Sequence, residues 1–444
     1  MRGTGRVIVV AGLAVAVFSL GGIGLLRRVR PEPRARPSAE ASSALQRRPV
    51  VESASVAAVI SGLQERLKAV PGDWRGHAQL GMAYVQQARI TGDPSYYPKA
   101  EGVLRRSLAL RDEANVDAMI GMAALATARH DFAAALSWGL RAKAVDPGDA
   151  TIYALIGDAQ VELGRYDEAF HAFQRMIDLR PDLSSYARAS YAWELQGSYP
   201  NAVEAMELAL QAAVAPADVA WASGQLGDLH FSRGRLREAR RHYRRALAAD
   251  EYVPARVGLA RVDAARGRVR EAIRGYLWAV ERFPIPEYVI SLGDLYTLTG
   301  DRERADRQYA LLEVQERLLR ANGVNVDLEV ALFNADHNVN LRVGLALAEA
   351  EWSRRKSVHV ADAMAWSLYA AGRFEEALDY ADQALRLGTQ NALFFFHRGM
   401  IERALGKNRA ARSDLARALA INPHFSILWS GEATRAIETL GGAP

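Results

Sequence analysis

Few residues of this chain are spaced for chemistry, and the most suggestive of them are the neighbours Asp336 and His337. A carboxylate and an imidazole are metal ligands, but no second pair of ligands stands at a suitable spacing. Adjacent Asp and His residues at a helix turn more commonly cap a helix end. The pair therefore predicts a turn, and no metal site is expected.

Catalytic motifs are missing from the rest of the sequence. It contains no phosphate-binding loop, no G-x-S-x-G elbow and no H-E-x-x-H zinc motif. The 444 residues include 9 scattered histidines and no cysteine, which removes thiolate ligands, thiol nucleophiles and disulfides. We therefore expect a protein that is not an enzyme, with no catalytic residue and no cofactor.

A glycine followed five residues later by an alanine recurs at a nearly constant spacing. The recurrent alanines are Ala169, Ala202, Ala239, Ala272, Ala305, Ala377 and Ala411. Successive members lie 33, 37, 33, 33, 72 and 34 residues apart, and the 72-residue step leaves room for one hidden unit. A period near 34 indicates a stacked array of units that bury their apolar faces only against one another. Such arrays usually present surfaces to partners.

Several segments resemble the tetratricopeptide repeat, a helix-turn-helix unit of 34 residues. Residues 150–183 carry the pattern in Tyr153, Ile156, Gly157, Ala169, Phe173 and Pro181. Similar copies begin at residues 220, 253, 286 and 392, and poorer copies at 116, 183 and 358. The resemblance implies an all-α, right-handed superhelix of about nine to ten helix-turn-helix repeats over residues 71–425.

Three stretches are expected to differ from the regular repeats. Residues 324–357 lack the glycine-aromatic turn but keep apolar residues at helical spacing, so they are the expected hidden unit, with Asp336 and His337 at its turn. Residues 55–70 and 426–444 each predict one amphipathic helix. These two helices are expected to cap the ends of the array.

In the tetratricopeptide family the first helix of each unit lines a concave groove, and the resemblance places ten residues there. They are Asp158, Glu162, Tyr191, Glu194, Asp228, Arg261, Asp294, Asp362, Trp366 and Tyr369. Apart from Arg261 the charged members are acidic, so they favour a basic or mixed peptide segment as the ligand, with Trp366 and Tyr369 as anchors. The alternative is that the acids merely solvate the helix face. The Lys and Asn carboxylate clamp of the family's chaperone-binding members is missing.

Arginines dominate the second helices of two neighbouring units, which should face the convex side. They are Arg233, Arg235, Arg237, Arg240, Arg241, Arg244, Arg245, Arg266, Arg268, Arg270 and Arg274. One interpretation is a surface for anionic lipid or another acidic partner. The other, which is commoner for such runs, is a solvated helix face.

The positive charge of the whole chain belongs mainly to its N-terminal segment. Residues 1–50 hold nine arginines and two acidic residues, a net charge of +7. The remaining residues hold 47 basic and 49 acidic side chains, a net charge of −2. Because the array is nearly neutral, nucleic acid is not expected as its partner.

The N-terminal segment predicts a membrane anchor. Residues 7–26 carry no charge over 20 positions, about the length that a helix needs to cross a bilayer. The run ends at Arg27 and Arg28, which favours an uncleaved single-pass anchor within residues 1–30 over a cleaved signal sequence. Residues 31–54 are rich in Pro, Arg and Ser and predict a flexible tether. More arginines follow the span than precede it, which favours repeats on the cytoplasmic side.

Together these features predict a non-enzymatic scaffold or adaptor, tethered to a membrane, that binds protein partners through the concave face of its superhelix. The first alternative is a secreted or periplasmic binding protein built on the same array after cleavage of the signal, and the more distant one is an enzyme of unrecognised type. A fold of this kind does not identify its partner.

Overall fold

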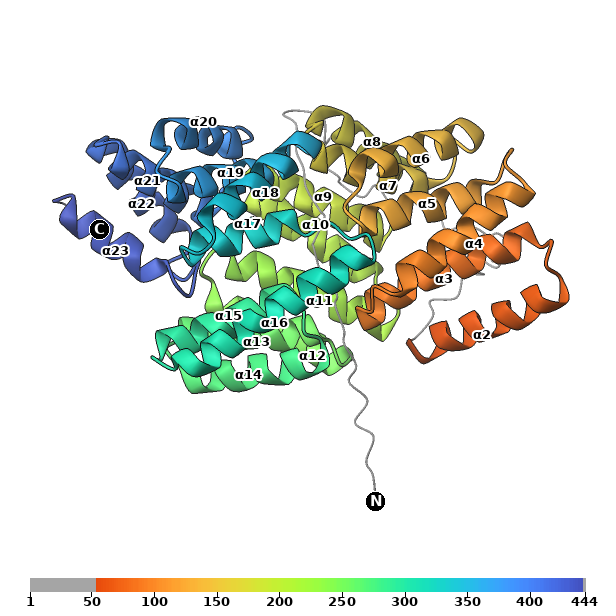
Figure 1. The fold of residues 1–444 in the computed structure, drawn as a ribbon, viewed down its shortest axis with the longest axis horizontal. Coiled ribbons are helices and arrows are strands. Elements are labelled where there is room, and N and C mark those ends of the chain that lie inside the picture. Colours follow the sequence, from red (N-terminus) through yellow and green to blue (C-terminus); the bar gives the residue numbers. More distant parts are fainter. Residues whose placement is uncertain (1–52, 442–444) are drawn as a thin grey trace, which may run out of the picture.

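The structure, a computed structural model, describes residues 53–441, with side chains from Val56 onward. Within that range the chain forms helices α2 to α23 and no strand (Figure 1). The predicted all-α array is therefore confirmed. The predicted anchor at residues 7–26 lies outside the described residues, and no helix between residues 53 and 441 is both long and apolar enough to cross a bilayer.

Ten helix pairs follow one another between two single helices, α2 (Ser53–Ala69) and α23 (Ser430–Thr439). The pairs are α3 (Trp74–Thr91) with α4 (Tyr96–Leu110), α5 (Val116–Ala128) with α6 (Phe132–Val145), α7 (Ala150–Glu162) with α8 (Tyr166–Leu179), α9 (Leu183–Leu195) with α10 (Tyr199–Ala212), α11 (Pro216–Phe231) with α12 (Leu236–Ala249), α13 (Val253–Ala265) with α14 (Val269–Arg282), α15 (Pro286–Leu298) with α16 (Arg302–Ala321), α17 (Asp327–Asp336) with α18 (Leu341–Arg354), α19 (Val358–Ala370) with α20 (Phe374–Leu385), and α21 (Ala392–Ala404) with α22 (Asn408–Ile421). Each pair packs internally, and successive pairs pack on each other as in a solenoid. The junction between α15–α16 and α17–α18 is looser and is made by side chains, with the rings of Tyr309 and Phe333 5.3 Å apart.

The small residues of the repeat lie where helices approach most closely. All seven recurrent alanines are at most 2% exposed. Tyr243 of α12 fills the space between Gly227 of α11 and Gly258 of α13, and a methyl group on either glycine would lie 2.4 Å from its ring. Because that distance is far below van der Waals contact, only glycine leaves room for the ring. Small residues therefore set the spacing between helices, and large rings fill what remains.

The stretch 324–357, which departs from the repeat pattern, contains the helix pair α17 and α18. Helix α17 has 10 residues, ends at Asp336 and is followed by His337 as its C-cap residue. Gly344 of α18 packs closely on Asn334, since a methyl group on Gly344 would lie 2.8 Å from the Asn334 Cβ. A close helix crossing thus forms here without the regular glycine-aromatic turn.

The array winds so tightly that its second turn rests on its first. The loops before α17, α19, α21 and α23 lie against the C-terminal ends of α5, α7, α9 and α11 (Figure 1). Where these loops bond to the helix ends, the paired residues are between 191 and 196 apart in the sequence. About six repeats therefore complete one turn of the superhelix, because each repeat has roughly 34 residues.

Four hydrogen bonds recur between the turns, and we call them the inter-turn ladder. Asn325 N donates to Arg129 O (3.2 Å), Lys356 N to Glu162 O (3.2 Å), Thr389 Oγ1 to Leu195 O (2.6 Å) and Asn422 Nδ2 to Phe231 O (3.0 Å). Each acceptor lies at the C-terminal end of a first helix, where carbonyl groups lack partners inside the helix. The second turn thus supplies donors to helix ends of the first.

Gly197 permits the close approach at one position of this contact. Its φ is +74°, a conformation that other residues rarely adopt, and a Cβ there would lie 2.4 Å from the carbonyl oxygen of Gly388 on the second turn. The glycine that ends α9 is therefore required both by its own turn and by the stacking of the turns.

Candidate functional site: an acidic cavity between the two turns

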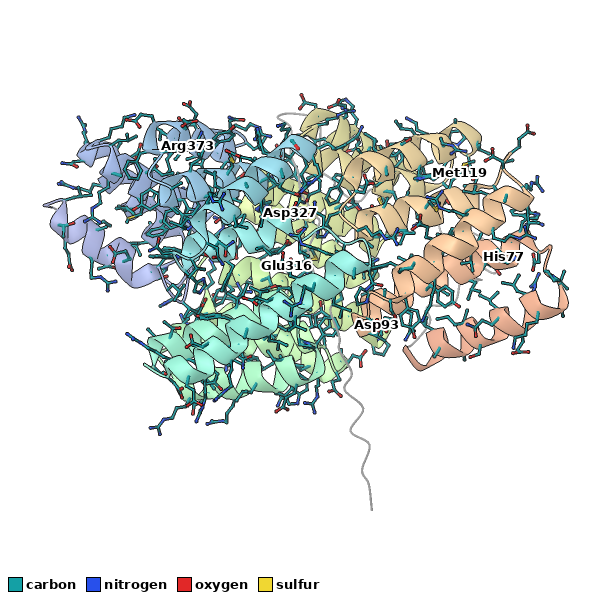
Figure 2. All side chains as sticks on the ribbon, viewed as in Figure 1. His77, Asp93, Met119, Glu316, Asp327 and Arg373 are labelled. Carbon is teal, nitrogen blue, oxygen red and sulfur yellow. The ribbon has the colours of Figure 1, made fainter. Side chains whose placement is uncertain are left out.

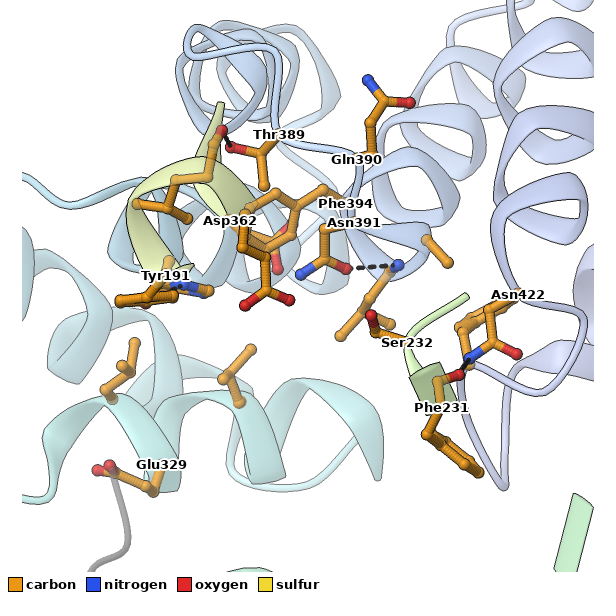
Figure 3. Close-up of a pocket in the computed structure, with 18 of the residues that line it drawn as sticks. Tyr191, Phe231, Ser232, Glu329, Asp362, Thr389, Gln390, Asn391, Phe394 and Asn422 are labelled. Carbon is orange, nitrogen blue, oxygen red and sulfur yellow. Dashed lines mark hydrogen bonds between the residues drawn. The ribbon is translucent and has the colours of Figure 1, made fainter. Parts of the chain in front are cut away.

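A cavity of about 540 Å³ lies between the two turns, within the usual size range of ligand pockets. Figure 3 shows Tyr191 and Phe231 of the first turn and Glu329, Asp362 and Phe394 of the second turn around it. Its wall comes chiefly from α9, α11, α17, α19 and α21. Because both turns supply walls, the cavity depends on the closed superhelix.

Carboxylates outnumber guanidinium groups in the wall. The acids are Glu162, Glu194, Glu329 and Asp362, and the arginines are Arg261 and Arg355. His359 also lines the cavity, and burial lowers its pKa and so favours the neutral ring. Carboxylates held close together in a recess repel one another unless cations or donors neutralise them. The cavity therefore favours a ligand that carries positive charge.

Two of these carboxylates have unused acceptor capacity. Within the described residues Glu194 forms no side-chain hydrogen bond or ion pair, and burial raises its pKa to about 7, while the charge of Arg233 opposes that rise and the charge of Asp228 adds to it. Oε2 of Glu329 is buried and has no hydrogen-bond partner in the described part of the chain. Both residues belong to the cavity wall.

Glu162 and Arg355 instead hold the turns together. Arg355 Nη1 donates to Glu162 Oε2 at 2.8 Å, and the two side chains are only 4% and 5% exposed. Arg355 Nε also bonds Glu351, and its guanidinium lies over the ring of Phe132 with the centroid 5.1 Å away. This cation is already used by the fold and is not available to a ligand.

The predicted aspartates bond to later units of the array. The pairs are Asp158 with Arg188 (2.6 Å), Asp228 with Arg261 (2.9 Å), Asp294 with His337 (2.9 Å) and Asp362 with His397 (2.9 Å). Asp158 and Asp362 are 6% and 3% exposed. Burial raises the pKa of Asp158 and of Asp228, against the opposing charges of their arginine partners. These acids connect neighbouring units, which is more than the solvation of a helix face.

Trp366 and Tyr369 belong to an aromatic cluster near the C-terminal end of the array. Their rings stack with centroids 4.6 Å apart, and Trp366 is 2% exposed. Its Nε1 donates to Asp336 Oδ1 at 2.9 Å, and Nε1 of Trp429 donates to the same oxygen at 2.8 Å. A partner therefore does not reach the Trp366 ring in this conformation. In the described part of the chain no group of three His, Cys, Asp or Glu could hold a metal ion.

Half of the ten predicted groove residues meet at the cavity: Glu162, Tyr191, Glu194, Arg261 and Asp362. The other five, Asp158, Asp228, Asp294, Trp366 and Tyr369, are not part of its wall. The sequence pattern misses Glu329 and Arg355 because the stretch 324–357 offers no repeat frame in which to place them. It also misses Gln390, which lies in a loop between units.

Comparison with known families identifies the repeats. Tetratricopeptide-repeat profiles match residues 155–218, 219–249 and 363–424. The chain therefore contains tetratricopeptide repeats, and the resemblance seen in the sequence is confirmed for these segments. Repeats of this type typically form scaffolds for protein interaction. No curated protein matches the chain.

Solved structures with a similar course of the chain include other helical arrays. The human IFIT1 dimer with m7Gppp-AAAA is 16% identical, with 76% of this chain and 78% of that chain covered and a TM-score of 0.47. The APC/C hetero-tetramer Cut9-Hcn1 is 14% identical, with 86% and 81% covered and a TM-score of 0.39. A tetratricopeptide repeat protein from Parabacteroides merdae is 17% identical, with 59% and 99% covered and a TM-score of 0.35.

Proposed function

We propose that this protein is a non-enzymatic scaffold or adaptor that binds a basic segment of a protein partner in the cavity between its two turns. Repeat arrays generally bind partners on extended inner surfaces. Here the second turn covers part of the inner surface, so the cavity is the recessed part of that surface which remains unfilled. The binding residues of the proposal are Tyr191, Glu194, Glu329 and Asp362.

The observation that carries this proposal is the presence of two unpaired carboxylates, Glu194 and Glu329, in one cavity. A Lys ammonium or an Arg guanidinium would donate to them in charge-assisted hydrogen bonds. The rings of Tyr191 and Phe394 line the same space and would contact the methylene groups of such a side chain. A basic side chain thus meets both charge and apolar complementarity.

Binding of a cation is expected to deprotonate Glu194. Because its pKa is raised to about 7, the carboxyl of the empty cavity is largely protonated below that pH. A cation beside it favours the ionised form and lowers the pKa. The affinity for a basic segment should therefore rise as the pH rises through about 7.

A peptide array tests the proposed ligand class. The full chain is applied to immobilised peptides that differ in basic, neutral and acidic side chains. We expect it to retain basic peptides, and Glu194→Gln to weaken their binding about tenfold, since a hydrogen bond to a charged group contributes roughly 1.5–3 kcal/mol. Glu207→Gln is the matched control because Glu207 is exposed on α10, outside the cavity wall. Equal binding by both variants, or no preference for basic peptides, would show that the proposal is wrong.

The proposal includes a membrane tether through residues 7–26, which lie outside the described residues. We expect N-terminal sequencing of the mature protein to begin at Met1 or Arg2, because the basic residues after the span favour an uncleaved anchor. A chain that begins beyond the span would support the secreted or periplasmic alternative. An export reporter fused after Pro444 tests the side, and activity outside the cell would contradict a cytoplasmic array.

A further inference from the structure

The outer helices α12 and α14 carry an arginine surface that the cavity does not explain. Residues 233–274 contain 13 arginines and 5 acidic residues, a net charge of +8. Residues 51–444 together have a net charge of −2, so the part of this range outside residues 233–274 has a net charge of −10. We call the following residues the arginine surface: Arg237, Arg240, Arg241, Arg244, Arg245, Arg266, Arg268 and Arg270.

The members of this surface are neighbours in space as well as in sequence. Burial and then the charges of Arg244, Arg268 and Arg266 lower the pKa of Arg240, so charges from α12 and from the loop before α14 converge on it. Figure 1 places α12 and α14 beside each other along one edge of the molecule. Charges of the arginine surface from two neighbouring units therefore meet at Arg240.

An ordinary solvated helix would intersperse its charges, as neighbouring α16 does. There Arg307 pairs with Glu303 at 2.5 Å, and Arg320 pairs with Glu316 and with Asp327. In α12 the residues four positions apart are instead like charges: Arg237 with Arg241, Arg240 with Arg244, and Arg241 with Arg245. Like charges at this spacing destabilise a helix. An anionic partner would relieve that repulsion, which water alone only screens.

We propose that the arginine surface docks on a bilayer that contains anionic lipids. Arginine binds phosphate oxygens through two parallel hydrogen bonds, and basic residues are attracted to anionic headgroups within a Debye length. The predicted anchor favours lipid as the occupant: if residues 7–26 cross a bilayer, the 22 residues from 31 to 52 can span at most about 75 Å, and the array stays beside that bilayer. The described chain begins with α2, which lies toward the same edge of the molecule as α12 (Figure 1).

This docking concerns the outer face and does not depend on a ligand in the cavity. It does use the predicted anchor to choose lipid over other anionic surfaces. The predicted anchor would hold the array near the membrane but would not by itself choose which face turns toward the lipid. The arginine surface supplies the orientation, with the opposite edge at α20 facing away from the bilayer.

The absence of cysteine allows a direct test with a single labelled position. The full chain is placed in nanodiscs of phosphatidylcholine alone or mixed with phosphatidylglycerol, with an energy acceptor on the lipid headgroups. A donor dye is attached at Ala248→Cys, an exposed position of α12, or at the matched control Ala371→Cys, an exposed position close to Arg373 at the opposite edge (Figure 2). We expect anionic lipid to increase energy transfer at position 248 and not at position 371.

Charge variants decide the cause. The combination Arg240→Glu, Arg241→Glu, Arg244→Glu and Arg245→Glu should abolish the increase, whereas the four corresponding Arg→Lys changes, which keep the charge and the fold, should preserve most of it. High salt should also remove it. Equal transfer in both lipid mixtures, or an increase that survives charge reversal, overturns the proposal and leaves the surface to an acidic protein or a nucleic acid. If the chain does not insert into discs, its co-sedimentation with vesicles of the same two compositions is measured instead. Binding that increases with anionic lipid and is lost on charge reversal supports the proposal, and equal binding to both compositions overturns it.

Discussion

Arg355 and Glu194 show two ways in which this array treats a buried charge. Arg355 sits between Glu162 and Glu351, so its burial is compensated on two sides. Glu194 has no such partner among the described residues, and burial raises its pKa to about 7. The first arrangement stabilises the contact between the turns, whereas the second leaves a group whose ionisation awaits a cation.

Arg355→Met is expected to destabilise the array by about 3–5 kcal/mol, because it leaves the buried carboxylate of Glu162 without its cation, whereas Glu351 keeps its pair with Arg354. Adding Glu162→Gln should recover part of the loss, since one uncompensated charge is then removed. Thermal unfolding of the single and double variants measures this. If the single change leaves the unfolding midpoint unchanged, the ion pair is not what holds the turns together at this position.

The stability of the array should fall as the pH rises through the pKa of Glu194. Between about pH 4.5 and 7 the folded chain binds this proton more tightly than the unfolded chain, so the stabilisation is complete at low pH and is lost as the carboxyl ionises. Glu194→Gln removes this dependence. From pH 5 to pH 8 we expect the free energy of unfolding of this variant to rise by about 1–2 kcal/mol relative to that of the unchanged protein. This value is reduced because the carboxyl borders the cavity. Unfolding midpoints at the two pH values test the sign, and parallel pH curves would refute it.

The spacing between helices in the array depends on aromatic rings that fill the space beside glycine residues. Tyr243 lies between two glycines of neighbouring first helices, and its own hydroxyl donates to Asp228 at 2.8 Å. The ring therefore links α11, α12 and α13 by packing and by one hydrogen bond. A similar arrangement brings Gly157 of α7 to the ring of Phe173 of α8 within one earlier unit.

Gly227→Ala should destabilise the array by about 1–3 kcal/mol, because the new methyl group would lie 2.4 Å from the Tyr243 ring and would displace it. Gly102→Ala in α4 is the control, since nothing lies within 4 Å of a Cβ there and alanine favours a helix. The two changes should shift the thermal midpoint in opposite directions. A stabilising Gly227→Ala would contradict the role given to the close packing.

The period of the sequence predicts the helix pairs because small and aromatic residues that meet within a unit recur locally. It does not predict the rotation from one unit to the next, which depends on how each pair packs on its neighbour. The sequence therefore does not predict that Asn325, Thr389 and Asn422 donate hydrogen bonds between the turns, because their acceptors lie about 190 residues away. The sequence pattern places Trp366 on a first helix but does not predict its burial. Phe396 and Trp429, which cover it, come from the units that follow.

On the scale of the whole molecule, the stacked turns convert an open inner surface into a recess of limited size. The inter-turn ladder repeats with the units, so each added repeat of the second turn adds one donor to one helix end of the first. Opening the superhelix would expose four carbonyl groups to water and would remove one wall of the cavity. Closure and ligand binding are therefore expected to depend on each other.

Thr389→Val together with Asn422→Leu should open the superhelix without melting its helices. The carbonyl group of Leu195 would lose its donor, at about 1–3 kcal/mol, and that of Phe231 would lose its second-turn donor while it keeps Gly234 N, at a smaller cost. Small-angle scattering should show a larger radius of gyration while circular dichroism stays unchanged. Thr439→Val is the control because the Thr439 hydroxyl bonds within its own helix. Identical scattering from the double variant and the control would mean that the ladder does not maintain closure.

Calorimetric titration of the full chain with a basic peptide selected on the array tests the central claim most directly. At about pH 6, in two buffers with different ionisation enthalpies, the difference in heat gives the number of protons released on binding. We expect the unchanged protein to release close to one proton per peptide, because Glu194 is protonated in the empty cavity and ionised beside a cation. Glu194→Gln should bind about tenfold more weakly and release none. Equal affinity and equal proton release in the two proteins would show that basic segments do not bind in this cavity.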